Sequence, residues 1–153
     1  MAKVAVGGTF EYLHDGHKQL INKAFELASG GEVHIGITSD RMAQRPDRRV
    51  SDYNTRKNSL ISYINDSSLS DTDYHIYELH DPYGLTLKED YDYIVVSPET
   101  YDTALKINEL RVDSGYQPIE ISRIDYVMAL DGLPISSTRI SQGVIDAHGR
   151  LLK

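Results

Sequence analysis

The amino-acid sequence predicts an α/β fold in which a parallel, five-stranded sheet carries helices on both faces. Two observations support this prediction: short β-like runs alternate with segments of helical spacing, and polar or turn-forming residues follow the runs. A length of 153 residues, with 40% hydrophobic and 25% charged content, suits one globular domain spanning residues 1–153. No repeat, low-complexity tract or linker indicates a second domain.

The first strand is predicted at Lys3–Gly7, where an apolar run meets a glycine turn. Apolar residues then recur at helical spacing from Leu20 to Ala28, and Gly30-Gly31 ends that helix. The second strand is predicted at Glu32–Thr38, because its valine and isoleucines alternate with other residues and so share one face. This is the first strand–helix–strand unit.

A second helix is indicated by the apolar spacing of residues 60–64, with a cap near Ser51 or Asp52. Tyr74–Leu79 follows as the third strand, and Tyr93–Ser97 as a fourth, apolar and buried one. The third helix contains Ala104, Ile107 and Leu110 and is closed by Gly115, before a fifth strand at Ile119–Ile124. Together these elements predict a doubly wound, Rossmann-like sheet, whose ligands bind at the carboxyl ends of the strands.

Composition and charge exclude several classes of protein. Cysteine is absent, so there is no disulfide framework, thiolate metal site or cysteine nucleophile. The chain has no signal-peptide core at its start and no membrane-spanning apolar run, so we expect a cytoplasmic protein without a membrane partner. The net charge of −7 argues against general nucleic-acid binding, but segment 41–57 carries +4, which leaves −11 for the remainder. That segment predicts a local anion site.

The sequence His14-Asp15-Gly16-His17 follows the first strand and the glycine turn Gly7-Gly8, where a helix begins. Glycines let the backbone approach an anion, and a helix N-terminus offers unpaired N–H groups and a partial positive charge. Imidazoles can donate to phosphate oxygens as charge builds up during transfer. This arrangement predicts a polyphosphate site.

Other interpretations of the histidines remain open. The pair could cap or decorate a helix, whereas a zinc site is a poor interpretation because no third ligand is evident near it. His34 and His75 fall inside strands and His148 lies near the tail, so we interpret these three as structural. His80 follows a strand at the ligand-binding edge.

A second polar motif, Ile135-Ser136-Ser137-Thr138-Arg139-Ile140, places hydroxyls where a helix would start. The hydroxyls could simply cap that helix. Together with Gly7-Gly8-Thr9-Phe10 and the two histidines, however, the motif resembles the HxGH and ISSTxI signatures of the nucleotidylyltransferase superfamily. Within it, the whole chain is most similar to the archaeal-type phosphopantetheine adenylyltransferases, as segments 36–40, 96–100, 107–111 and 131–134 indicate.

The resemblance implies transfer of the adenylyl group of ATP to 4′-phosphopantetheine, giving dephospho-coenzyme A and pyrophosphate. It implies that His14 and His17 contact the nucleotide phosphates and that His17 stabilises the transition state. Thr9 and Phe10 are expected between the two substrates. The full set of expected ATP-binding residues is Gly8, Thr9, Phe10, His14, Gly16, His17, Ser136, Ser137, Thr138 and Arg139.

The acceptor's binding residues are less clear from the resemblance. Bacterial relatives place a lysine after the second strand, where this chain has Arg41, with Arg45, Arg48 and Arg49 as rivals. We expect Thr9, Arg41 and His80 to bind the acceptor. Magnesium is expected to arrive with ATP and to need few protein ligands, so no resident metal site is predicted. The oligomeric state is not predicted.

Two alternatives are kept. A sister nucleotidylyltransferase acting on glycerol 3-phosphate, FMN or nicotinamide mononucleotide would show nearly the same motifs. A non-catalytic nucleotide-binding module would be expected to have a degraded HxGH motif, which is intact here.

Overall fold

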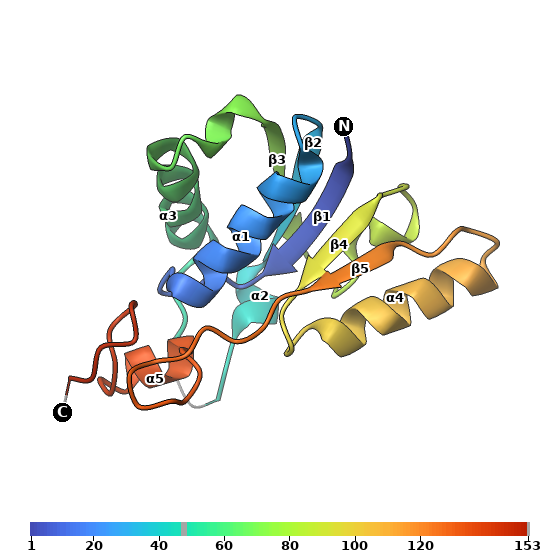
Figure 1. Ribbon diagram of the computed structural model, residues 1–153. Coiled ribbons are helices and arrows are strands. Elements are labelled where there is room, and N and C mark those ends of the chain that lie inside the picture. Colours follow the sequence, from blue (N-terminus) through green and yellow to red (C-terminus); the bar gives the residue numbers. More distant parts are fainter. Residues whose placement is uncertain (47–48, 153) are drawn as a thin grey trace.

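The computed structural model describes residues 1–46 and 49–152 and contains a five-stranded sheet in the order β3-β2-β1-β4-β5 (Figure 1). Every neighbouring pair of strands is parallel, which confirms the predicted α/β fold. The strands are β1 (Lys3–Gly8), β2 (Glu32–Thr38), β3 (Asp73–Leu79), β4 (Tyr93–Val96) and β5 (Glu120–Arg123).

The three helices predicted from apolar spacing are present as α1 (Asp15–Ala28), α3 (Tyr53–Asp66) and α4 (Tyr101–Asp113). Asp52 is the residue that caps α3, since its side chain accepts a hydrogen bond from the Thr55 backbone N–H. Two short helices, α2 (Asp40–Ala43) and α5 (Ser137–Ser141), and two single 3₁₀ turns, η1 (Leu69–Asp71) and η2 (Gly84–Leu87), complete the fold. Segments this short cannot display a repeating apolar pattern, so periodicity does not reveal them.

Alternation along β2 assigns its side chains to the two faces of the sheet. Val33, Ile35 and Ile37 are fully buried in a core that α1 and α3 complete. The opposite face has a second core, in which Ala104 and Ile107 of α4 pack against residues of β1 and β4. Helices therefore cover both faces, as Figure 1 shows, with α1 and α4 on opposite sides of the central strands.

The winding of the chain reverses between β1 and β4. From β1 the sheet grows through β2 to β3, and from β4 it grows the other way to β5. In doubly wound sheets, the carboxyl ends of the two strands at such a reversal form the ligand crevice. Gly8 at the end of β1 and Val96 at the end of β4 therefore mark the expected site.

The segment after β5 folds back onto the start of α1. The Asp15 backbone N–H donates to the Ala147 carbonyl at 3.0 Å, and the Ser137 hydroxyl donates to the Glu11 carbonyl at 2.6 Å. A small third core of Ala129, Ile135 and Ile145 stabilises this segment. The two distant motifs thus meet at one edge of the sheet.

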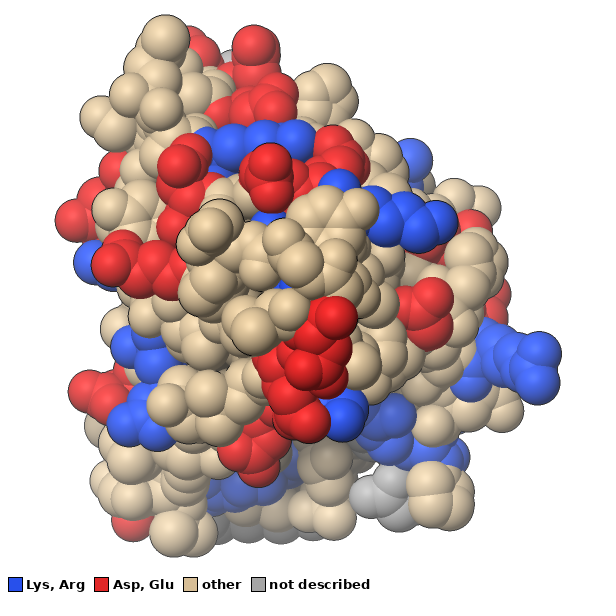
Figure 2. All heavy atoms as spheres, turned by 90° about the vertical axis from the view of Figure 1, so that its right-hand side faces the viewer, with Lys and Arg blue, Asp and Glu red and all other residues tan. Residues whose placement is uncertain are grey.

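The charged side chains are mixed over the side of the molecule that carries α4. Figure 2 shows blue and red groups interspersed there, without a continuous basic strip among the described residues of that face. Within the same described ranges, no helix is long and apolar enough to cross a membrane.

Candidate active site

A cavity of about 540 Å³ lies at the carboxyl ends of β1 and β4 and extends over the adjoining face of the sheet. This volume is typical of small-molecule sites in proteins. Residues of both sequence motifs line it. From the expected ATP-binding set, those at the cavity are Gly8, Thr9, Phe10, His14, Gly16, His17, Ser136, Ser137 and Thr138.

His14 is the N-cap of α1. Its Nδ1 atom accepts hydrogen bonds from the backbone N–H groups of Gly16 and His17, at 3.0 and 3.3 Å. In return, Nδ1 of His17 accepts from the His14 backbone N–H at 3.2 Å, so the two histidines form a reciprocal capping box. Capping uses Nδ1 of each ring, and the predicted contact with phosphate would use Nε2. The two interpretations of these histidines are therefore compatible.

The capping bonds determine which ring nitrogen can donate. Because Nδ1 of each imidazole accepts a backbone hydrogen, the neutral ring carries its own hydrogen on Nε2. Burial lowers the pKa of His14 to about 4, so this ring is neutral at pH 7. The His14 and His17 rings stack with their centroids 3.7 Å apart. Two Nε2–H donors on stacked rings suit a chain of phosphate oxygens.

The start of α1 differs from the sequence-based expectation in one respect. The backbone N–H groups of Asp15, Gly16 and His17 already have partners, namely the Ala147 carbonyl and Nδ1 of His14. They are therefore not the unpaired donors that we expected at this helix terminus. The dipole of α1 still favours negative charge there, and the imidazoles stay the side chains at this end from which donation to a phosphate is predicted.

Gly16 makes room for the His14 ring. A Cβ atom at this position would lie 2.8 Å from Cε1 and 3.0 Å from Nδ1 of His14. Any larger residue would therefore displace the capping imidazole. The structure thus explains the glycine of the HxGH motif by packing inside the protein, beside its expected place among the ATP-binding residues.

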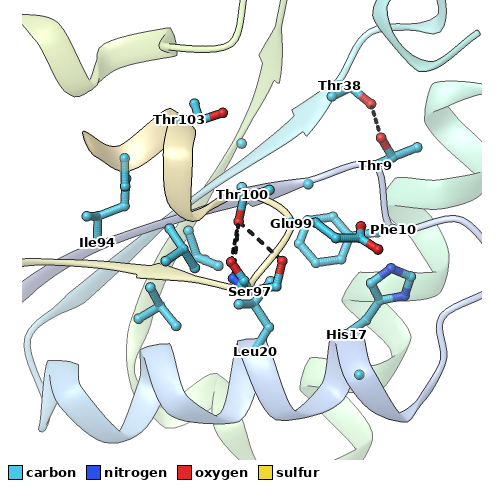
Figure 3. Close-up of a pocket in the computed structure, with 18 of the residues that line it drawn as sticks. Thr9, Phe10, His17, Leu20, Thr38, Ile94, Ser97, Glu99, Thr100 and Thr103 are labelled. Carbon is cyan, nitrogen blue, oxygen red and sulfur yellow. Dashed lines mark hydrogen bonds between the residues drawn. The ribbon is translucent and has the colours of Figure 1, made fainter. Parts of the chain in front are cut away.

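The loop between β1 and α1 has a constrained backbone. Phe10 and Tyr12 have φ values of 55° and 49°, in the left-handed region that residues with side chains rarely adopt. The Phe10 side chain is almost completely buried, and its ring centroid lies 5.4 Å from that of His17. Figure 3 shows His17 next to Phe10, with Glu99 of the β4–α4 loop nearby. Strain of this kind gathers at functional sites, where the surrounding structure holds it in place.

Arg56 of α3 forms a hydrogen bond to the same loop. It is 1% exposed, and its Nη1 donates to the carbonyls of Thr9 and Thr38 at 3.1 and 2.8 Å. Nη1 also donates to the Thr38 hydroxyl at 3.2 Å, and that hydroxyl donates to the Thr9 hydroxyl at 3.0 Å (Figure 3). Because the Thr9 hydroxyl accepts from Thr38, its own hydrogen is not used in the bond between these two residues.

Arg56 is a residue whose role the sequence reasoning missed, because it was counted only as one charge of the basic segment. A signal was available: Arg56, Leu60 and Ile64 are spaced by four residues along α3, and all three are buried. A charged residue that continues an apolar helical stripe is a candidate for a buried, fully bonded group. No role was predicted from the sequence for Thr38 either, the residue at the end of β2 that Arg56 binds.

Three of the expected site residues lie elsewhere. Arg41 of α2 and His80 are exposed and do not line the cavity. Arg139 is bound to the Asp131 carboxylate and the Pro134 carbonyl, also away from the cavity lining. Their roles in binding stay predictions.

From the basic segment, Arg45 lines the cavity. Arg48, another rival for the acceptor phosphate, lies outside the described residues.

The cavity also has an apolar wall that continues away from the histidines. It is formed by residues of β3, β4, α4 and the η2 region, namely Tyr77, Leu79, Pro82, Tyr83, Leu85, Ile94 and Ile107. A ligand with a phosphate at the motifs and a less polar arm along the sheet would match both parts of the cavity.

Comparisons with known proteins agree with this geometry. The chain matches the family described as Cytidylyltransferase-like over residues 5–143. It is 56% identical to the phosphopantetheine adenylyltransferase of Methanosarcina barkeri, covering 100% of this chain and 94% of the relative. It is 47% identical to the protein of the same name from Archaeoglobus fulgidus, covering 98% and 99% of the two chains.

A solved structure gives the same result for the fold. A protein of unknown function from Archaeoglobus fulgidus superimposes with a TM-score of 0.73 at 44% identity, covering 82% of this chain and 99% of that one. The resemblance drawn from the two motifs is therefore confirmed. With its matched sequence, parallel sheet and histidine site, the chain belongs to the cytidylyltransferase-like family of nucleotidyltransferases.

Proposed function

We propose that this protein transfers the adenylyl group of ATP to 4′-phosphopantetheine, giving dephospho-coenzyme A and pyrophosphate, a step of coenzyme A biosynthesis. The observation that carries the proposal is a single cavity that joins the stacked imidazoles of His14 and His17 to the hydroxyls of Ser136–Thr138 and to an apolar wall. Relatives similar over the whole chain are named phosphopantetheine adenylyltransferases, which supports the choice of substrates.

The reaction needs little acid–base chemistry from the protein. The phosphate monoester of the acceptor has a second pKa near 6, so it is already roughly a dianion at neutral pH. One of its oxygens attacks the α-phosphorus of ATP, and the bond from that phosphorus to the bridging oxygen of the β-phosphate breaks. The electron pair leaves with pyrophosphate. Catalysis therefore consists of placing two anions in line and stabilising the charge that develops.

The imidazoles are the groups proposed to stabilise that charge. Both rings present Nε2–H, because both Nδ1 atoms accept backbone hydrogens at the start of α1. As hydrogen-bond donors they gain strength when negative charge grows on the phosphate oxygens, and they cost no reorganisation because the cap already orients them. His17 is the proposed catalytic residue, and His14 the proposed ligand of the neighbouring phosphate.

Thr9 is proposed to lie between the two substrates. Its backbone carbonyl accepts from Arg56 and its hydroxyl oxygen accepts from Thr38, and the hydroxyl hydrogen is proposed to donate to a substrate oxygen. Arg45, the cavity-lining cation of the basic segment, is proposed as counter-charge for the meeting phosphates. Arg41 stays a second candidate for the acceptor phosphate.

Magnesium is proposed to accompany ATP. Carboxylates of Glu99 and Asp125 line the cavity together with several hydroxyls, and oxygen atoms are the ligands that Mg²⁺ prefers. When bound, the ion would supply positive charge that neutralises the leaving pyrophosphate.

The apolar wall favours a long acceptor over a small one. Phosphopantetheine carries an extended arm beyond its phosphate, and Tyr77, Leu79 and Ile94 offer that arm a surface along the sheet. Glycerol 3-phosphate has no such arm, and FMN and nicotinamide mononucleotide carry rings instead. The apolar wall therefore favours phosphopantetheine over the other three acceptors. The two motifs alone would not distinguish among the four.

The decisive experiment measures pyrophosphate release with ATP or CTP, each paired with all four acceptors. We expect the highest kcat/KM for ATP with 4′-phosphopantetheine. Higher kcat/KM with another acceptor or with CTP would replace the proposed substrates. No release with any pair, from folded protein, would favour a non-catalytic nucleotide-binding module.

A further inference from the structure

A cluster of potential metal ligands lies on the sheet away from the reacting end of the cavity. It comprises Glu32 and His34 of β2 and His75 of β3, each of which offers one ligand atom within 4.8 Å of the others. The register explains the cluster: His34 and His75 are direct neighbours in the parallel pair, and Glu32 lies two residues before His34 on the same face. We propose that Glu32, His34 and His75 bind one zinc ion.

The distances between the donor atoms suit a single ion. Two ligand atoms bound to tetrahedral zinc lie about 3.4 Å apart, given metal–ligand bonds of about 2.1 Å. Nε2 of His34 lies 3.3 Å from one carboxylate oxygen of Glu32, and Nε2 of His75 lies 3.9 Å from the other. His34 is buried, whereas Glu32 is half-buried and His75 is exposed, so the side chains of Glu32 and His75 have room to adjust around an ion at His34.

The surroundings of His34 support a metal at its Nε2 atom. Nδ1 of His34 lies 2.9 Å from the hydroxyl of Tyr91, which can accept a hydrogen bond from Nδ1–H. A partner of this kind at the second ring nitrogen orients metal-bound histidines in many sites and leaves the lone pair of the first nitrogen for the ion.

The nearest cation does not block the site. Nζ of Lys3 is 3.9 Å from the Glu32 carboxylate but only 2.9 Å from that of Glu89, to which it donates a hydrogen bond. Lys3 can therefore keep Glu89 as its partner while Glu32 turns to the ion. Two imidazoles with one carboxylate favour zinc and its neighbours over magnesium or calcium.

The proposed site is separate from the catalytic one. His34 precedes Thr38 by four residues on β2, which corresponds to roughly 13 Å along the strand. The ion would link β2 to the edge strand β3 at the amino end of the sheet, so its expected effect is on stability. His34 also lines the far end of the cavity, so the two sites share one wall.

The test uses full-length protein without a histidine tag, stripped with a chelator and kept in millimolar Mg²⁺. Calorimetric titration with Zn²⁺ should give one site, Zn²⁺ should raise the melting temperature, and Co²⁺ should give the visible absorption of tetrahedral coordination. His75→Ala and Glu32→Gln should weaken Zn²⁺ binding by more than the roughly 10–100-fold loss typical of an outer hydrogen bond. Tyr91→Phe should fall within that 10–100-fold range.

His80→Ala is the matched control, because His80 also pairs with a glutamate, Glu78, at 3.9 Å but belongs to no three-ligand cluster in the described part of the chain. Its affinity for Zn²⁺ should equal that of the wild type. Absence of one-site binding in the wild type would overturn the proposal. So would unchanged binding in both His75→Ala and Glu32→Gln, or equal loss in His80→Ala.

Discussion

Arg56 provides a sharp test of how the fold positions the reacting groups. Its guanidinium makes five hydrogen bonds of 2.8 to 3.2 Å, to Ser51, Thr9, Thr38 and Asp40. We predict that Arg56→Met lowers both stability and kcat. Methionine keeps much of the apolar stem, so the variant removes mainly the donors.

The expected magnitude follows from the partners that lose a donor. Carbonyls of Ser51, Thr9 and Thr38 would remain partly buried and unbonded, at a cost of about 1 kcal/mol each or somewhat more. The free energy of unfolding should fall by about 3 kcal/mol, which lowers the melting temperature by about 10 °C in a domain of this size. Movement of Thr9 should lower kcat by about 10–100-fold.

Arg111 of α4 is a matched control within the same chain. It is also almost completely buried, its Nε and Nη1 donate to the carbonyls of Gln117, Thr86 and Glu89, and its Nη2 pairs with Asp90. Arg111→Met should therefore cost similar stability, but it should leave kcat with saturating substrates near the wild-type value. Both arginines bind three carbonyls and one aspartate, and Arg56 alone also binds a hydroxyl, that of Thr38.

The assay combines urea unfolding followed by circular dichroism with steady-state pyrophosphate release, corrected for the folded fraction. Arg56→Lys provides a milder variant, since it retains the charge but cannot make the planar fork. Equal loss of kcat in the Arg56 and Arg111 variants would refute a positioning role for Arg56. Full kcat in folded Arg56→Met would refute it too.

Four further predictions concern the cavity. His17→Ala should lower kcat by about 10²–10³, as kinetics would show, while calorimetry should find a loss of only about 1 kcal/mol of stability, the cost of one capping bond; a loss of activity no larger than the loss of folded protein would make His17 structural. His14 should make stability depend on pH: its folded pKa of about 4 lies below the ordinary 6.5, so its contribution is present above pH 6.5 and is lost as pH falls toward 4. Wild type should therefore lose about 2 kcal/mol between pH 7 and pH 5 that His14→Asn, which keeps a cap, does not lose. Gly16→Ala should raise the KM for ATP by displacing the His14 ring, and an unchanged KM would contradict the packing argument. Arg45→Ala should raise the KM for 4′-phosphopantetheine more than Arg41→Ala does, because Arg45 lines the cavity and Arg41 does not. The reverse order would make Arg41 the better candidate for binding the acceptor phosphate.

The sequence alone was enough for much of the architecture. The alternation of β2 and the apolar spacing of α1 follow from local residue order, since the two sides of a strand or helix must meet different surroundings. The parallel sheet and its ligand-binding edge then follow from the order of strands and helices. Glycine, histidine and hydroxyl motifs at that edge indicated a phosphate site, because those residue types supply the required donors.

Tertiary structure decided which atoms of these motifs remain available. Nδ1 of His14 and the N–H groups at the start of α1 satisfy one another, and the Ser137 hydroxyl binds the Glu11 carbonyl. The Ser137 pairing depends on how segments far apart in the chain meet, which residue spacing does not reveal; the His14 cap is local, and the structure was needed only to show which ring nitrogen accepts. Arg56 acts on Thr9 from 47 positions away. A charge on an apolar helical stripe indicates a buried group, but only the folded chain shows which carbonyls it holds.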